Sequence, residues 1–121
     1  MRIRILTDRA PIPRNPYSQA IVTSGRLLFI SGQTPVDPLT SERVLGTFEE
    51  QAHQVFQNLQ AIAEAAGGSL RAAVKVNAYL NDMSDFAQFN KVYVQYFPEP
   101  RPARTTCQVR LPGFLIEVDA V

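Results

Sequence analysis

The sequence contains very few of the residues from which redox and metal sites are usually built. Among 121 residues there is one cysteine, Cys107, one histidine, His53, and no tryptophan. A single cysteine excludes a disulfide within the chain, and one cysteine with one histidine cannot form an ordinary Cys/His zinc site. We therefore expect no metal site, and a reducing compartment fits the composition.

The sequence also lacks a long apolar run and an excess of one charge. No stretch approaches the roughly 18 apolar residues of a membrane span, and the apolar run before Asp8 is very short. There are 12 basic and 11 acidic residues, which gives a net charge of +1 without any block of like charge. Proteins that bind nucleic acids normally concentrate positive charge in a patch or stripe. The sequence therefore predicts an unanchored, cytoplasmic protein and argues against nucleic acid as its main partner.

The composition is otherwise that of a globular protein, with 45% hydrophobic and 19% charged residues. The length fits a single domain over residues 1–121. A domain of this size buries only about two-thirds of the surface that its unfolded chain exposes. Association of several copies would bury additional surface of each chain.

The N-terminal part of the chain predicts strands and loops. Residues 2–6 alternate between basic and apolar side chains, which indicates a short edge strand, and three prolines in residues 10–16 predict an extended loop. Two apolar runs flank Gly25 within residues 19–31 and predict an antiparallel hairpin. Turn-forming residues make residues 32–46 a loop, with a brief strand near Val44.

The pattern changes to helical periodicity after Thr47. Thr47 and Glu50 match a capping box, apolar residues then recur at helical spacing, and Gly67 is suited to the turn that ends the helix. Residues 73–80 alternate as a half-buried strand, expected to run parallel to an earlier strand. Residues 86–97 carry aromatic residues along one face of a second helix, with Asp82 and Ser84 as candidate N-caps, and prolines end it.

The C-terminal segment alternates on both sides of Pro112 and Gly113, which predicts a final hairpin. The order of elements predicts an α+β fold in which two helices cover one face of a mixed β-sheet. The other face of that sheet would then have no helix to cover it.

Four stretches of the sequence resemble the reactive intermediate deaminase family, also called RidA/YjgF. They are "NPYSQAI", "FISGQTPVDP", "NDMSDFAQFNKVYVQYF" and "RPARTTCQV" with "LIEVDAV", and together they span nearly the whole chain. The resemblance implies a chorismate-mutase-like fold and a homotrimer whose sheets face inward. It also places the active sites in clefts between neighbouring subunits.

The resemblance implies hydrolysis of reactive enamines and imines, such as 2-aminoacrylate, 2-iminopropanoate and 2-iminobutanoate, to 2-oxo acids and ammonia, without a cofactor. Arg104 matches the family arginine that binds the substrate carboxylate, a task that suits the planar donor fork of guanidinium. Glu117 matches the glutamate that activates the hydrolytic water, and Asp119 shares its face of the strand as the alternative. Without the resemblance, Arg104 and Glu117 would both be assigned to solvent.

Further residues match positions that line the family's pocket. Asn90 lies on the second predicted helix, and Thr106 occupies the position where many members have a cysteine. Cys107 follows one residue later and should lie on the opposite side of the strand as a small apolar residue. The remaining matches are Tyr17, Ser31 and Gly32.

Two positions call for different expectations. Asn15 replaces the glycine that usually precedes "PYSQ", so the conformation of that loop is open. His53 lies among glutamines on the polar side of the first predicted helix and is expected to be solvated, not catalytic.

Two other functions are compatible with the same residues. A non-catalytic regulatory protein could hold small carboxylates in the same cleft, where Arg104 would matter for binding but turnover would be absent. An RNA-directed nuclease or translation inhibitor would show salt-sensitive RNA affinity. The near-neutral charge argues against the second of these.

Overall fold

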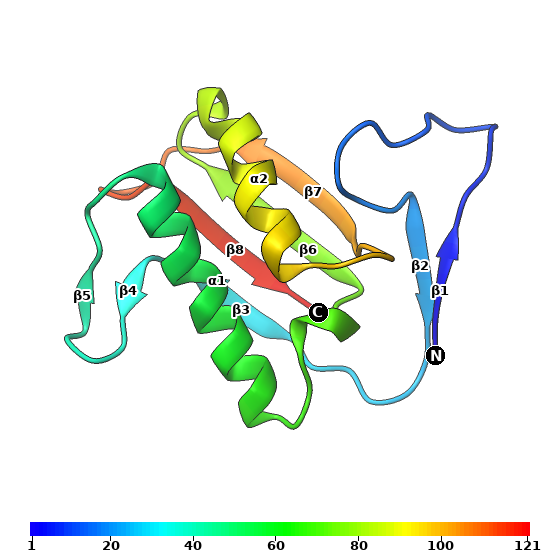
Figure 1. The fold of residues 1–121 in the computed structure, drawn as a ribbon, viewed down its shortest axis with the longest axis horizontal. Helices are drawn as coiled ribbons and strands as arrows, with labels where there is room; N and C mark the ends of the chain where they lie inside the picture. Colours follow the sequence, from blue (N-terminus) through cyan, green and yellow to red (C-terminus); the bar gives the residue numbers. More distant parts are fainter.

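The computed structural model describes all residues 1–121 and has a four-stranded mixed sheet at its centre (Figure 1). The strand order is β3-β8-β6-β7, with β6 and β7 parallel and the other neighbours antiparallel. The strands are β3 (Ile30–Gln33), β6 (Lys75–Leu80), β7 (Ala103–Gln108) and β8 (Ile116–Ala120). β7 is therefore an edge strand, and β6 and β8 occupy the centre.

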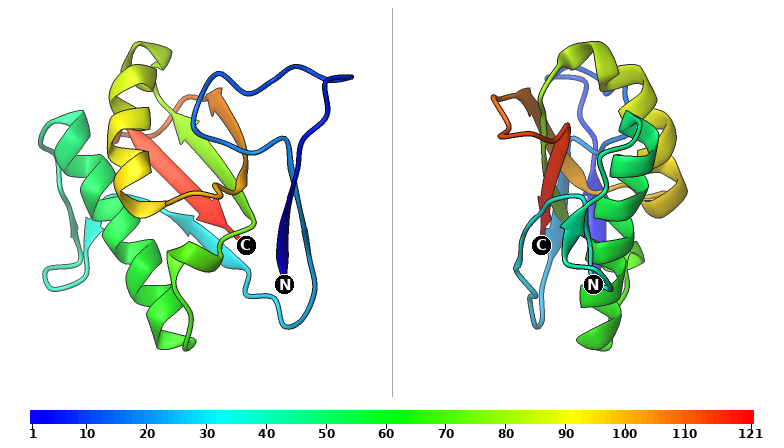
Figure 2. Two further views of the ribbon diagram at one scale, coloured as in Figure 1. Left: turned by 45° about the vertical axis from the view of Figure 1, so that its right-hand side comes forward. Right: turned by 90° about the vertical axis from the view of Figure 1, so that its left-hand side faces the viewer.

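Two helices, α1 (Phe48–Ala65) and α2 (Phe86–Tyr96), cover one face of this sheet and leave the other without a helix (Figure 2). The Thr47 side chain accepts a hydrogen bond from the Glu50 N–H at 3.2 Å, which caps the start of α1. Gly67 has a φ of +83°, the left-handed conformation expected just past the helix end. The sequence prediction of two helices on one face of a mixed sheet is confirmed.

Short elements connect the helices to the sheet. A 3-10 turn, η1 (Leu70–Ala72), follows α1, and a second one, η2 (Met83–Asp85), leads directly into α2. The Asp82 side chain accepts from the Ser84 N–H at 2.8 Å and caps η2. Asp82, as one of the two predicted caps, therefore starts the segment that continues into α2.

The core lies between the helices and the sheet and is rich in aromatic rings. Phe56 of α1 is completely buried and has ring neighbours along α2 and just beyond it, at centroid distances of 5.1 to 6.2 Å. These neighbours are Phe89, Tyr93, Tyr96 and Phe97. Large rings at these separations supply much of the apolar area that a small domain can bury.

Two small hairpins lie outside the central sheet. β1 (Arg2–Ile5) pairs with β2 (Ala20–Thr23), and this hairpin lies beside the β7 edge of the molecule (Figure 1). It is attached by Arg2, whose guanidinium donates to the carbonyl oxygens of Ala73 and Pro100 at 2.7 to 2.9 Å. β4 (Val36–Asp37) and β5 (Glu42–Arg43) form the other hairpin, in the region where the sequence predicted a loop with one brief strand.

The hairpin predicted over residues 19–31 is wrong. Gly25 does adopt a turn conformation, with a φ of +100°, but β2 pairs with β1 while β3 pairs with β8. Residues 24–29 separate the two strands and are exposed. β3 instead pairs with β8, where Ile30 is buried under α1. The partner of a strand is decided by burial of its side chains and not by the residues of the turn.

Two other predictions of strand pairing are also wrong. β7 and β8 do not form a hairpin, because β6 lies between them and pairs with both. β6 runs parallel to β7, which follows it in the sequence, and not to an earlier strand. Helix α2 forms the crossover between these two parallel strands, the usual connection for such a pair.

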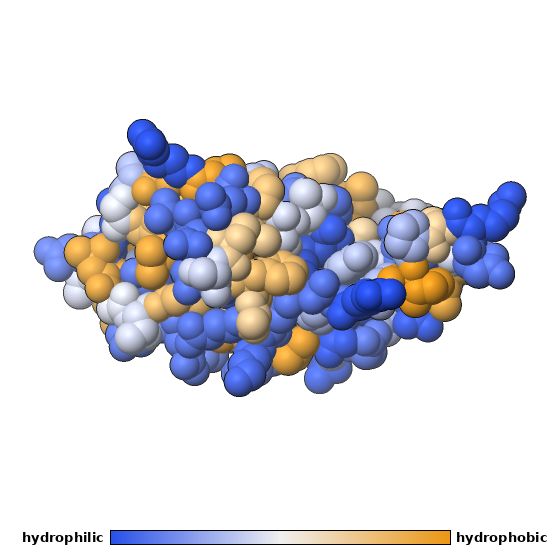
Figure 3. Space-filling model, turned by 90° about the horizontal axis from the view of Figure 1, so that it is seen from above, coloured by the Kyte–Doolittle hydropathy of each residue, from blue (hydrophilic) through white to orange (hydrophobic).

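The surface mixes hydrophilic and hydrophobic residues, as the face in Figure 3 shows. Large exposed hydrophobic residues are spread over several segments, with Phe29 73% exposed and Leu39 93% exposed. The model contains no helix with the length and apolar character needed to cross a membrane.

We expect Thr47→Ala to lower the free energy of unfolding by about 1 kcal/mol, because the Glu50 N–H loses its acceptor. Urea denaturation measures this change. Thr47→Ser is the matched control, because it keeps the hydroxyl oxygen and should retain most of the stability. Equal stability of the alanine variant and the wild type would contradict the capping role.

Candidate functional site

Arg104 lies on the edge strand β7, on the side covered by α2. Four aromatic rings surround its guanidinium carbon: Tyr93 at 4.7 Å, Phe89 at 5.0 Å, Phe86 at 5.7 Å and Tyr17 at 5.8 Å from the ring centroids. Each distance is within the range of a cation–π interaction. The arginine predicted from sequence is therefore held in an aromatic cage and is not a solvated surface charge.

The guanidinium of Arg104 has no counter-charge in the chain. No salt bridge involves this residue, and its Nη1 is a buried donor without a hydrogen-bond partner. Burial lowers the pKa of Arg104, while Tyr93 and Tyr17 act in the opposite direction. A partly desolvated cation with a free N–H is a binding site for an anion, and a carboxylate fits its planar donor geometry.

The buried polar atoms without a partner all lie around this arginine. They are Asn90 Oδ1, Tyr93 OH, Arg104 Nη1 and Thr106 Oγ1. Buried polar atoms in folded proteins are nearly always hydrogen-bonded, so four exceptions in one place indicate a site for a polar ligand or water. Sequence analysis had selected three of these residues and had assigned Tyr93 to the apolar face of the helix.

The loop before β2 brings Tyr17 to the arginine. Ser18 is buried, and its N–H donates to the Pro102 carbonyl oxygen at 3.1 Å. This hydrogen bond belongs to a β-bridge between Ser18 and Ala103, the residue before Arg104. Asn15 ties the same loop to α2, because its Oδ1 accepts from Asn90 Nδ2 at 3.1 Å. Asn15 thus has a structural role at the position where glycine was expected.

These side chains form one group on the helix-covered side of β7. We call it the arginine half-site and define it as Tyr17, Asn90, Tyr93, Arg104 and Thr106.

Glu117 lies on the opposite face of the sheet. Arg104 is paired with Val76 of β6, and Glu117 is paired with Tyr79 of the same strand. Paired residues share a face, and positions three apart on a strand lie on opposite faces. Arg104 and Glu117 are therefore separated by the sheet within one chain.

Gly32 lies beside Glu117 on this face. A Cβ on Gly32 would overlap the Glu117 carboxylate and would lie 3.2 Å from its carboxyl carbon, so the absence of a side chain lets the two strands bring these groups together. Ser31 is exposed next to Gly32 on β3. We call Ser31, Gly32 and Glu117 the glutamate half-site.

Asp119 shares the face of Glu117, as predicted, but is already hydrogen-bonded. Its Oδ1 accepts from Asn77 Nδ2 at 2.9 Å and its Oδ2 accepts from the Tyr79 hydroxyl at 3.3 Å. Burial and the Asp119 carboxylate both raise the pKa of Tyr79, so the phenol remains a donor. Cys107 is paired with Tyr79 and shares this face, which confirms that Thr106, and not Cys107, lies on the side of Arg104.

The other candidate groups of the molecule lie elsewhere. His53, expected to be solvated, is instead half-buried, and its Nδ1 lies 2.7 Å from the Tyr96 hydroxyl. No group of three or more histidine, cysteine, aspartate or glutamate residues is placed to hold a metal ion.

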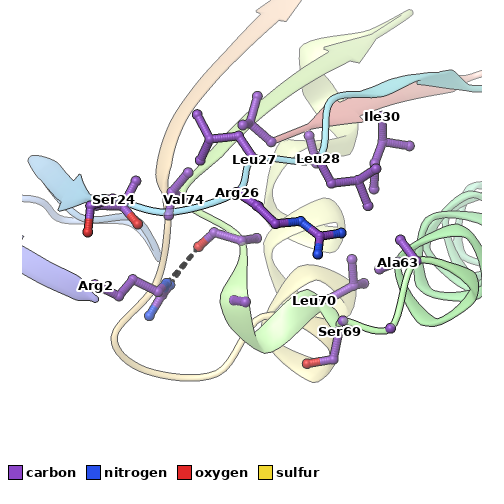
Figure 4. Close-up of a pocket in the computed structure, with 18 of the residues that line it drawn as sticks. Arg2, Ser24, Arg26, Leu27, Leu28, Ile30, Ala63, Ser69, Leu70 and Val74 are labelled. Carbon is purple, nitrogen blue, oxygen red and sulfur yellow. Dashed lines mark hydrogen bonds between the residues drawn. The ribbon is translucent and has the colours of Figure 1, made fainter.

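A cavity of about 640 Å³ lies away from both half-sites. Figure 4 shows it between η1, the end of α1 and residues 24–28, with Arg26 extending into it from the chain that leads to β3. None of the site residues predicted from the sequence lines this cavity.

Comparisons with known proteins give a consistent result. A family model described as "Endoribonuclease L-PSP" matches residues 7–121. A RutC family protein of Pyrococcus horikoshii is 51% identical over 123 residues, which cover 100% of this chain and 97% of the relative. A RutC family protein of Sinorhizobium fredii is 49% identical over 119 residues, 97% of this chain and 94% of the relative.

A solved structure gives the same relationship. The crystal structure of RidA from the Antarctic bacterium Psychrobacter superimposes with a TM-score of 0.75 at 48% identity, and the alignment covers 98% of this chain and 96% of that one.

We expect a small carboxylate such as 2-oxobutanoate to raise the melting temperature of the wild-type protein through the arginine half-site. At about 100 times the dissociation constant, a ligand that binds only the folded state adds about 2.7 kcal/mol of stability. Arg104→Met should abolish this effect, because the anion loses its cation. Thermal denaturation with increasing ligand measures it.

Arg110→Met is the matched control for this titration, since Arg110 is exposed and forms no ion pair. It should respond to the carboxylate as the wild type does. An equal shift in the Arg104→Met variant would place the anion elsewhere.

Proposed function

The chain belongs to the RidA/YjgF family, and from this premise we propose that it hydrolyses reactive enamine and imine intermediates to 2-oxo acids and ammonia. The substrates are small amino-acid derivatives such as 2-aminoacrylate, 2-iminopropanoate and 2-iminobutanoate. All of them carry a carboxylate next to the reacting carbon.

The unpaired guanidinium of Arg104 is the observation that carries this proposal. It has an aromatic cage, a free N–H and two further orphan groups beside it, Asn90 Oδ1 and Thr106 Oγ1. A carboxylate supplies the missing charge and accepts from the free donor, while a hydroxyl or amide nearby can bond to the nitrogen or oxygen of the reacting centre. The site thus favours a small anion that also carries a polar reactive group.

We further propose that the complete site forms between two copies of the chain in a homotrimer. The arginine half-site and the glutamate half-site lie on opposite faces of one sheet, so they cannot meet on one substrate within a single chain. The helix-free face with Glu117 is available for a neighbouring copy, whose β7 edge would bring Arg104. In a closed ring, each copy places its arginine half-site against one neighbour and its glutamate half-site against the other, so that every shared site is complete.

The proposed reaction needs positioning and proton transfer. An enamine first gains a proton from solvent on its terminal carbon and becomes an iminium ion. Glu117 takes a proton from water, whose oxygen attacks the iminium carbon, and the C=N electron pair moves to nitrogen, which gives a neutral carbinolamine. Glu117 then passes its proton to that nitrogen, the C–N bond breaks and ammonia leaves, while the carbinolamine hydroxyl loses its proton to solvent and the C=O bond of the 2-oxo acid forms.

The two half-sites divide the work in this reaction. Arg104 would hold the carboxylate and fix the imine carbon in place, which lowers the entropic cost of the attack. Gly32 lies beside Glu117, and to the Gly32 N–H and the exposed Ser31 hydroxyl we assign the binding of the water or of the oxygen formed from it.

We expect the wild type to accelerate release of 2-oxobutanoate when threonine dehydratase generates the imine in the presence of semicarbazide. Arg104→Ala should lower kcat/KM at least about 100-fold, because a buried, charged hydrogen bond to the substrate is lost. Arg110→Ala is the control and should remain active. Carboxylate binding without any acceleration would favour the non-catalytic alternative, and RNA cleavage that survives Arg104→Ala would favour a nuclease.

We expect two inactive variants to complement each other. Glu117→Gln should lower kcat about 100-fold or more by removing the base. When Arg104→Ala and Glu117→Gln chains are unfolded together and refolded, random assortment gives about a quarter of the shared sites both native half-sites. Activity should therefore reappear in the mixture, and its absence would contradict a site shared between copies.

A further inference from the structure

Tyr93 is a buried tyrosine whose hydroxyl has no partner in the chain. Its relative exposure is 0%, and its ring stacks on Phe97 at 4.4 Å and contacts Phe56 at 6.0 Å. A phenol buried among rings normally finds an acceptor or donor, because an unmade hydrogen bond costs free energy. The Tyr93 hydroxyl is instead one of the four orphan polar atoms of the molecule.

Tyr96, on the same helix, shows that the fold can satisfy such a group. Its hydroxyl lies 2.7 Å from His53 Nδ1, in a partly buried contact between α2 and α1. Tyr93 points into the layer between α2 and the sheet, where Arg104 is its cationic neighbour at 4.7 Å. The orphan hydroxyl is thus a local feature of the arginine half-site.

Three arginines influence Tyr93, and their own hydrogen bonds differ. Arg2 donates to the carbonyl oxygens of Ala73 and Pro100, and Arg101 donates to the carbonyl oxygen of Phe97 and to Glu99. Arg104 alone among the three makes no side-chain hydrogen bond to the chain, and it forms no ion pair. The Tyr93 ring and the Arg104 guanidinium are therefore neighbours, and each carries a buried polar atom without a partner.

The protonation state of Tyr93 makes it a donor. Burial raises the pKa of its phenol, and this effect outweighs the opposite influence of Arg104, Arg101 and Arg2. The hydroxyl keeps its proton at neutral pH, and the ring that carries it contacts the guanidinium of Arg104, a second donor group. Two adjacent donors without an acceptor are complementary to a carboxylate, whose two oxygens accept about four hydrogen bonds.

We propose that Tyr93 is a substrate-binding residue, whose hydroxyl donates a hydrogen bond to the same carboxylate that Arg104 holds. This inference rests on the proposed function for the identity of the substrate and on the geometry for the role of the hydroxyl. It assigns a binding role to a residue whose sequence pattern indicates the hydrophobic core alone.

Tyr93→Phe tests the proposal, because it removes the hydroxyl and keeps the ring that contacts Arg104. Titration with 2-oxobutanoate by isothermal calorimetry should show an increase in Kd of about 10-fold or more, the loss expected for a hydrogen bond to a charged group. KM for the imine should rise by the same factor, with kcat within about twofold of wild type, since the hydroxyl binds the carboxylate and not the reacting carbon. Tyr96→Phe is the matched control and should change neither Kd nor KM.

A purely structural role for Tyr93 gives a different result. Removal of an unsatisfied hydroxyl from the core would then raise the melting temperature and leave Kd and KM unchanged, which would overturn the inference. In an Arg104→Ala background, Tyr93→Phe should cause no further loss of binding if both groups hold one carboxylate.

The binding and turnover measurements separate the inference from the proposed function. If the wild type binds 2-oxobutanoate in a Tyr93-dependent manner but does not accelerate imine hydrolysis, the deaminase proposal fails and the role of Tyr93 stands. If turnover is present and insensitive to Tyr93→Phe, the deaminase proposal stands and the role of Tyr93 fails. A wild type that binds no carboxylate contradicts both.

Discussion

The cation that the chain buries without a counter-charge is the constraint on which the rest of the site depends. Arg104 loses water on folding, which costs free energy that the chain offsets with four aromatic rings and not with a carboxylate. Three of these rings come from α2, and the fourth, Tyr17, is brought by the Ser18 bridge to β7. Rings stabilise the charge without occupying its N–H donors, so the guanidinium remains free to bind a planar anion.

The alternation of side chains along a strand explains why Arg104 and Glu117 of one chain do not meet. Arg104 and Glu117 belong to strands that both pair with β6, yet their partners, Val76 and Tyr79, fall on opposite faces. No rotamer change moves a side chain through a sheet. Under the proposed function, joining the two groups on one substrate would therefore require a second copy of the chain, which would approach Glu117 with its β7 edge.

The sequence predicted those features that depend on local interactions. The Thr47 cap, the glycine end of α1, the aromatic face of α2 and the alternation of β6 follow from neighbours a few residues apart. The pairing of the strands could not be predicted from such local patterns, because β6 lies between β7 and β8 through contacts between residues far apart in the sequence. The resemblance supplied Arg104 and Glu117, but their separation required the register of the sheet.

Tyr93 was missed for a related reason, since helical spacing identifies the buried face without showing what each polar atom meets there. The same distinction decides between Glu117 and Asp119, which periodicity cannot separate. Asp119 has both oxygens engaged by Asn77 and Tyr79, and withdrawing them would leave two half-buried donors unpaired. Glu117 accepts no hydrogen bond in the chain and lies over Gly32, where no side chain competes for its space. A general base accepts a proton from an incoming water. A carboxylate without internal hydrogen bonds can do so without leaving other groups of the chain unpaired.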